Sequence, residues 1–123
     1  MATKLTPMIH VPDVRAAADW YVALGFALIG YNPTCSDTEV WDWAALRLGP
    51  TGLMFNLGGQ SSEAPRREVD LYIDTDALDV LWSRLRDRAE IVEPPHATEY
   101  GRREFIIRDL NRFWITFGQP VAR

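Results

Sequence analysis

Apolar positions near the start of the chain change from a strand-like run to a helical spacing. A short apolar segment at Pro7–Val11 ends just before Asp13, which is placed to cap a helix. The following apolar residues recur at three- and four-residue intervals, and Gly25 is a typical C-terminal stop. The apolar set consists of Ala16, Ala17, Trp20, Tyr21 and Leu24. The pattern predicts a strand and then an amphipathic helix over Asp13–Leu24.

Three strand-like segments follow the predicted helix. The first is Phe26–Tyr31, and a polar loop over residues 32–38 separates it from the other two. Val40–Leu48 and Leu53–Leu57 are joined by a turn at 49–52 that contains two glycines and a proline. The first part of the chain therefore has the pattern βαβββ.

The same order of elements returns after a small, polar segment at Gly58–Pro65, which has the composition of a linker. Val69–Asp74 alternates as a strand, and Asp76–Arg88 carries four large apolar residues on one helical face. A proline-rich loop follows, in which we expect His96 to be solvated. The remaining predicted strands are Ile91-Val92, Arg103–Arg108 and Phe113–Phe117.

The two patterns have the offset expected of a duplication. Their last turns begin at Gly49 and Asp109, which are 60 positions apart (109 − 49). We therefore expect an α+β fold of two βαβββ modules, residues 1–57 and 66–123, joined by a linker at 58–65 and together forming one domain. The mixed sheets of this fold are expected to form a cleft.

The composition is that of a globular protein with more aromatic residues than a small core requires. The chain has 123 residues, 47% of them hydrophobic, with five Trp, four Tyr and five Phe, so we expect some rings to line a cavity. A formal net charge of −4 provides no basic field for nucleic acid or an anionic membrane surface. No apolar run has the length of a membrane span. One cysteine, Cys35, and an N-terminal segment without a leader pattern indicate a cytoplasmic protein.

Both ends of the chain resemble one superfamily. TPMIHVPDVRAAADWYVALGF is similar to the opening strand and helix of the glyoxalase, bleomycin-resistance and dioxygenase superfamily, also called the vicinal oxygen chelate superfamily. YGRREFIIRDLNRFWITFGQ is similar to its closing hairpin. The family's closing turn usually reads Asp-Pro-x-Gly, whereas Leu110 and Arg112 occupy the Pro and Gly places here. If the turn needs a positive φ, Asn111 is the residue best able to adopt it.

The resemblance also assigns positions for metal ligands. Metal-dependent members place His, Glu or Gln on the first and last strands of each module, and these places fall on Thr6, Asn56, Asp70 and Thr116. Only Asp70 is a credible ligand, because hydroxyl and amide oxygens neither offset the charge of a transition metal nor offer the nitrogen donors that it prefers. The chain thus resembles the metal-free branch that holds the bleomycin-resistance proteins, and we expect no metal site and no cofactor.

Strand alternation separates a helix-facing side from an opposite side in each module. The helix-facing positions are apolar, whereas the opposite side mixes aromatic and polar residues. The residues of this mixed side are His10, Met54, Asn56, Asp70, Tyr72, Trp114 and Thr116. Such a mixture is typical of a small-molecule pocket. For Tyr72 and Trp114 the alternative is that they simply cover the open face of the sheet.

Three further residues are candidates for the ligand site. Trp41 and Trp43 are two positions apart and are expected to share one face of a strand, where they either line the cleft or pack at a subunit contact. Glu104 is either a hydrogen-bond anchor inside the cleft or the surface ion-pair partner of Arg102 or Arg103.

The leading hypothesis is a metal-independent binding module that captures an aromatic or drug-like molecule in its cleft. The resemblance supports it, since resistance proteins of this superfamily sequester a drug at the clefts of a homodimer. No catalytic residue is assigned under this hypothesis. The alternative is an enzyme of the same superfamily, either a glyoxalase-like lyase or isomerase that moves a proton with His10 and Asp70, or a dioxygenase. A small molecule and a second copy of the chain are the expected partners.

Overall fold

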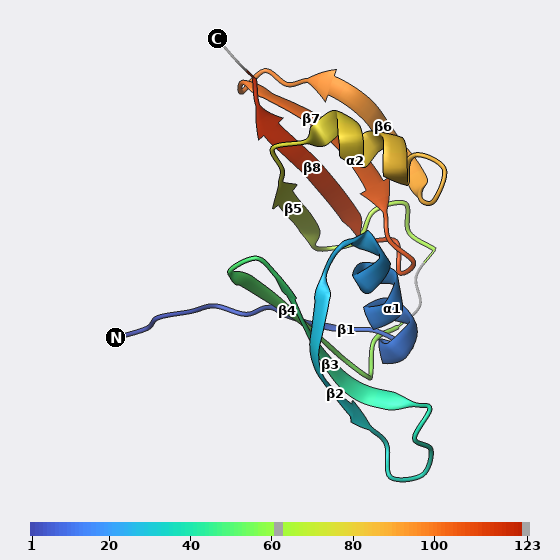
Figure 1. Ribbon diagram of the computed structural model, residues 1–123. Coiled ribbons are helices and arrows are strands. Elements are labelled where there is room, and N and C mark those ends of the chain that lie inside the picture. The colour runs from blue at the N-terminus through green and yellow to red at the C-terminus, as the bar shows by residue number, and fades with distance from the viewer. Residues whose placement is uncertain (61–62, 122–123) are drawn as a thin grey trace. The chain divides into compact units, whose positions relative to one another are not determined.

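The computed structural model describes residues 1–60 and 63–121 (Figure 1). Within them the chain forms eight strands and two helices in the predicted order of two βαβββ modules. The chain divides into two compact units, one on each side of residues 61 and 62. Neither helix in the described residues is long and apolar enough to cross a membrane.

The first unit is a four-stranded mixed sheet with one helix. Its elements are β1 (Met8–His10), α1 (Val14–Leu24), β2 (Ala27–Pro33), β3 (Trp41–Leu48) and β4 (Thr51–Asn56). The strand order is β1-β4-β3-β2, with β1 parallel to β4 and the other pairs antiparallel.

Helix α1 begins and ends where the sequence predicts. The Asp13 side chain accepts a 3.0 Å hydrogen bond from the Ala16 backbone N–H, which satisfies one free donor of the first turn. Gly25 ends the helix with a φ of 122°, a conformation that glycine adopts without strain. Tyr21 is fully buried, and its ring lies 5.1 Å from that of Phe55 on β4, which packs the helix against one face of the sheet.

A β-bulge interrupts the alternation of β3. Trp43 pairs with Asn32 of β2, but Trp41 pairs with the next residue, Pro33, so Asp42 is an extra residue on β3. The bulge turns Trp41 to the opposite side of the sheet from Trp43. The prediction that the two tryptophans share a face is therefore wrong, because a single inserted residue shifts the two-residue period by one position.

Ring contacts show which side each tryptophan occupies. Tyr31 pairs with Ala44 on the helix side, and its ring stacks on Trp41 with centroids 4.4 Å apart. The guanidinium of Arg15 on α1 lies 5.2 Å from the centroid of Trp41 on the same side. Trp43 lies on the other side of the sheet, where it pairs with Asn56 of β4.

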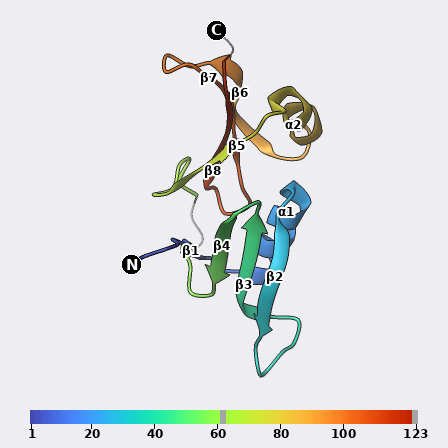
Figure 2. The ribbon, with the colours of Figure 1, turned by 60° about the vertical axis from the view of Figure 1, so that its left-hand side comes forward.

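The second unit repeats this architecture. It contains β5 (Asp70–Asp74), α2 (Leu78–Leu85), β6 (Glu90–Ala97), β7 (Arg102–Arg108) and β8 (Trp114–Pro120), in the strand order β5-β8-β7-β6. Helix α2 lies to one side of the sheet (Figure 2), where Trp82 packs on Phe105 and Phe105 stacks on Phe117. The helix is shorter than predicted. The side chain of Gln119 caps it by accepting a 3.0 Å hydrogen bond from the Leu78 N–H, and residues 86–88 form a turn.

Strand β6 is longer than the predicted Ile91-Val92 segment. It runs through Pro94 and Pro95, and its pairing with β7 shifts register twice. An edge strand tolerates proline because its outward N–H groups have no ladder partner. His96 is consequently half-buried on this strand opposite Glu104, and not in a solvated loop as predicted.

The turn between β7 and β8 adopts its positive φ at Arg112, with φ 69°, and not at Asn111. Arg112 occupies the place of the glycine in the resembled turn, so a non-glycine residue adopts the left-handed conformation here. The carboxylate of Asp109 holds this backbone, since its Oδ1 accepts hydrogen bonds from the N–H groups of Asn111 at 2.8 Å and Phe113 at 2.9 Å. The prediction for Asn111 is therefore wrong by one position.

Candidate ligand-binding site

The second sheet presents a mixed aromatic and acidic face on the side opposite α2. We call it the open face, and it consists of Asp70, Tyr72, Glu104, Ile106, Trp114 and Thr116. Asp70 pairs with Trp114, and Tyr72 pairs with Thr116, which pairs in turn with Ile106. Tyr72 is 61% exposed, so its ring is available for contact. The face has the composition predicted for a small-molecule site.

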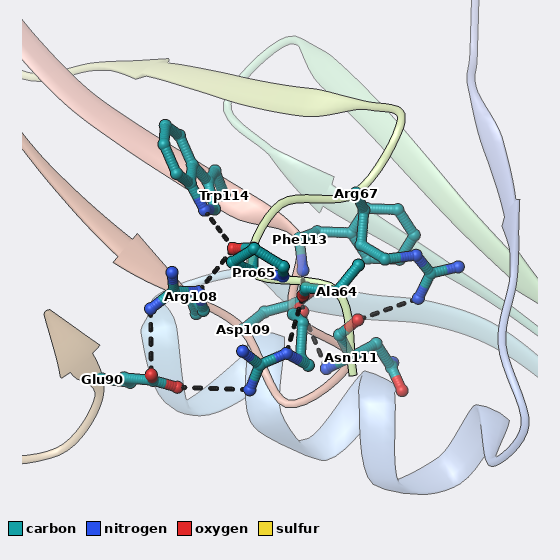
Figure 3. Close-up of polar contacts among 10 residues, drawn as sticks. Ala64, Pro65, Arg67, Glu90, Arg108, Asp109, Asn111, Phe113 and Trp114 are labelled. Carbon is teal, nitrogen blue, oxygen red and sulfur yellow. Dashed lines mark hydrogen bonds and ion pairs between the residues drawn. The ribbon is translucent and has the colours of Figure 1, made fainter. Parts of the chain in front are cut away.

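Trp114 is half-buried and its indole already has two contacts. Its Nε1–H donates a 2.9 Å hydrogen bond to the backbone carbonyl of Pro65, drawn in Figure 3. The guanidinium carbon of Arg66 lies 4.2 Å from the centroid of the ring. A cation thus covers one side of the indole, in a cation–π geometry.

Asp70 pairs with the same arginine. Arg66 Nε donates to Asp70 Oδ1 at 3.3 Å, and Arg66 Nη2 donates to Oδ2, so both carboxylate oxygens accept from one guanidinium. The hydrogen bond to Asp70 raises the pKa of Arg66.

In the first unit, His10 Nδ1 lies 3.1 Å from the Leu57 carbonyl oxygen.

Residues 64–67 cross the end of the open face, and we call them the strap. Their carbonyls accept hydrogen bonds from two arginines of the closing hairpin: Arg112 Nε donates to Ala64 at 2.8 Å and Arg108 Nε donates to Pro65 at 2.7 Å. Arg67 donates in the other direction, to the Asn111 carbonyl at 2.9 Å, and covers the ring of Phe113 at 4.5 Å. Figure 3 shows these contacts converging from the strap and the β7–β8 turn.

The strap was not predicted, because Ala64 and Pro65 were assigned to the linker at 58–65 and the two arginines to the start of the second module. The available signal was the excess of arginines at 66, 67, 108 and 112, with a proline at 65. Its contacts join residues more than 40 positions apart, which no local pattern reveals.

Glu104 lies on the open face and is only 2% exposed. Its Oε1 accepts a 2.6 Å hydrogen bond from the Tyr100 hydroxyl, and its Oε2 accepts one at 3.2 Å from Arg102 Nε. The hydrogen bond to Glu104 raises the pKa of Tyr100 to about 12. Arg102 was one of the predicted partners, but the carboxylate is buried and the arginine covers it, so the ion pair is not fully at the surface. The carboxylate therefore anchors neighbouring side chains.

In the first unit, the side opposite α1 carries His10, Trp43, Met54 and Asn56. Asn56 of β4 pairs with His10 of β1 and with Trp43 of β3, and His10 is exposed. Trp43 packs closely over Gly30, where an added Cβ would lie 3.2 Å from the indole ring.

Trp41 is separated from this group by the bulge and is 7% exposed. With Arg15 and Glu39 it lines a cavity of about 470 Å³ at the N-terminal end of α1. Arg15 and Glu39 form an ion pair at 2.5 Å. Trp41 therefore belongs to a different side of the unit from the other candidates.

The positions that the resemblance assigns to metal ligands do not fit a divalent ion. Thr116 is buried and offers only a hydroxyl, and both oxygens of Asp70 are bound by Arg66. Thr6 and Asn56 supply a hydroxyl and an amide. Within residues 1–60 and 63–121, no group of three or more His, Cys, Asp or Glu side chains is arranged to hold a metal.

A family model matches nearly the whole chain. The model for the Glyoxalase/Bleomycin resistance protein/Dioxygenase superfamily aligns with residues 5–117. No curated protein matches the sequence.

Several solved structures share the fold. TioX from Micromonospora sp. ML1 is 21% identical with a TM-score of 0.74, over 98% of this chain and 100% of that one. A bleomycin-binding protein complexed with bleomycin is 17% identical with a TM-score of 0.70, over 96% and 98%. The bleomycin resistance determinant encoded on transposon Tn5 is 17% identical with a TM-score of 0.73, over 98% and 100%. At these identities the likeness shows a common fold.

Proposed function

Because the chain belongs to the glyoxalase, bleomycin resistance and dioxygenase superfamily, we propose that it binds an aromatic or drug-like small molecule without a metal ion. The observation that carries this proposal is the exposed ring of Tyr72 on the same face as Trp114, beside the carboxylate of Asp70. Aromatic rings provide stacking area for a planar ligand, and the carboxylate provides a hydrogen-bond acceptor that orients it. One protein of this fold was solved with bleomycin bound.

The contacts of the acidic residues favour binding over catalysis. A general base needs a lone pair that reaches the substrate proton. Both oxygens of Asp70 and both of Glu104 accept hydrogen bonds from neighbouring side chains. These groups are better suited to hold a ligand or one another than to transfer a proton.

We also propose that the protein is a cytoplasmic homodimer. Each sheet ends in edge strands, β1 and β2 in one and β5 and β6 in the other, and pairing with a second copy is a common way to cover such edges. Light scattering during gel filtration tests this, because the monomer has a mass of 14.0 kDa. A measured mass equal to that of the monomer at micromolar concentration would contradict the dimer.

Calorimetric titration of chelator-treated protein with metal-free bleomycin tests the binding proposal. We expect binding by the wild type and roughly 2- to 13-fold weaker binding by Tyr72→Ala, since an aromatic pair contributes about 0.5 to 1.5 kcal/mol beyond its buried area. Tyr72 is exposed, so the variant should fold normally.

Tyr31→Ala is the matched control, because Tyr31 is also an exposed tyrosine on a strand but lies on the helix side of the first sheet. It should bind bleomycin like the wild type. Equal weakening in both variants would count against the open face, and stoichiometric metal in protein purified without chelator would count against metal independence.

A further inference from the structure

Arg66 makes the contacts that a planar cationic ligand would make on the open face. Its guanidinium lies over the indole of Trp114 at 4.2 Å and donates to both oxygens of Asp70. Stacking on an aromatic ring and paired donation to a carboxylate are the two interactions that define recognition of amidinium and guanidinium groups. The protein's own side chain thus reveals which chemistry this part of the face accepts.

The backbone on both sides of Arg66 is held in place. Before it, the Pro65 carbonyl accepts hydrogen bonds from Trp114 and Arg108. After it, Arg67 bonds to the Asn111 carbonyl and packs on Phe113, and its side chain is 11% exposed. The anchored backbone of the strap therefore positions the Arg66 side chain beside Trp114 and Asp70.

The side chain of Arg66 itself is free to leave. It is 54% exposed, and an ion pair in contact with solvent is held only weakly because water competes for both partners. Its departure breaks none of the hydrogen bonds of Pro65 or Arg67. The guanidinium is therefore the movable part of a strap whose backbone is anchored.

We propose that the Trp114–Asp70 site takes the planar cationic group of a small molecule, an amidinium or a guanidinium, and that Arg66 occupies this site as an internal competitor when no ligand is bound. The inference rests on the proposed binding function and names the ligand class for the same face. A neutral aromatic ligand that displaces Arg66 leaves the Asp70 carboxylate without its cation. A planar cation replaces both contacts of Arg66, so the site selects it.

The test compares benzamidinium with benzamide, a neutral molecule of nearly the same shape, by following the Trp114 indole N–H signal in NMR titrations. Arg66→Ala should bind benzamidinium on the order of 5- to 10-fold more tightly than the wild type, as expected if the competitor leaves the site free only about 10 to 20% of the time. Arg66→Met, which retains an apolar stem, should show the same direction of change. Asp70→Asn combined with Arg66→Ala should remove the preference for benzamidinium over benzamide.

Arg84→Ala is the matched control, because it removes the same charge from an exposed arginine of α2, on the other side of the sheet. It should leave the affinity of benzamidinium, followed at Trp114, unchanged.

Equal affinities for benzamidinium in the wild type and both Arg66 variants would overturn the internal competitor. Equal binding of benzamidinium and benzamide to Arg66→Ala would overturn the cationic ligand class. If bleomycin binds in a Tyr72-dependent manner and Arg66→Ala changes nothing, the proposed function stands and this inference fails. If no probe and no bleomycin bind to any variant, both fail.

Discussion

The guanidinium of Arg102 lies over Gly118 of β8, on the same side of the sheet as the open face. A Cβ added at Gly118 would be 2.3 Å from Arg102 Nη2, so any larger residue there must displace the arginine. Arg102 also connects Asp74, at 2.8 Å, with the buried Glu104. Because Gly118 has no side chain, Arg102 can reach across β8 and connect Asp74 on β5 with Glu104 on β7.

Gly118→Ala should destabilise the protein by about 1 to 3 kcal/mol, the cost of leaving a buried acceptor without its partner, since Glu104 then loses Arg102. Urea denaturation measures the change. Arg102→Met should have a similar effect, and the two substitutions combined should cost little more than either alone. Additive costs would show that the close approach of Arg102 to Gly118 is not the cause.

Tyr100 should titrate above the ordinary range of a tyrosine in the wild type. Its pKa is raised from 10.0 to about 12 by the hydrogen bond to Glu104, so tyrosinate absorbance should show a late step that Tyr100→Phe removes. Glu104→Gln should move that step back toward the ordinary value. Because the folded pKa is the higher one, the hydrogen bond stabilises the fold fully below pH 10 and its contribution disappears between pH 10 and about 12. A titration above pH 10 that is the same in the wild type and in Tyr100→Phe would contradict the contact.

Trp41 and Trp43 should respond differently to truncation because the bulge at Asp42 places them on opposite sides of the sheet. Trp41→Ala should destabilise by about 3 to 5 kcal/mol, as for a large buried aromatic residue. Trp43→Ala should cost less, since Trp43 is only half-buried. Thermal melting of the two variants measures the difference, and equal losses would argue that both rings lie in the same environment.

Arg112 should tolerate glycine better than alanine. Both substitutions remove its hydrogen bond to Ala64 and its contact with Glu90, but only glycine adopts a φ of 69° without strain. Arg112→Gly should therefore be more stable than Arg112→Ala by about 1 to 2 kcal/mol. Denaturant unfolding compares them, and a more stable alanine variant would contradict the left-handed turn.

The elements that the sequence predicts well are those encoded by neighbouring residues. Asp13 and Gly25 bound α1 through contacts made within the helix and its own caps. The duplication was visible because each module repeats the same local signals. Of the site, the placement of Tyr72 and Trp114 opposite the helix followed from the two-residue period of regular strands.

The elements that the sequence does not predict depend on contacts between distant segments. The bulge at Asp42 shifts the period without any local signature, and β6 accepts two prolines only because it lies at a sheet edge. Ala64 and Pro65 of the strap were interpreted as linker because the small and polar composition of residues 58–65 is typical of one, and Arg66 and Arg67 were placed in the second module without a predicted role. Its order comes from Arg108 and Arg112, more than 40 residues away.

The most direct test of ligand binding on the open face is an NMR titration of nitrogen-labelled, chelator-treated protein with metal-free bleomycin, following the five tryptophan indole signals. Binding as proposed shifts the Trp114 signal and leaves unchanged that of Trp82, which packs on Phe105 on the opposite side of the same sheet. A Trp114 signal that does not move at saturating bleomycin, or that moves only after a divalent metal ion is added, would contradict the account.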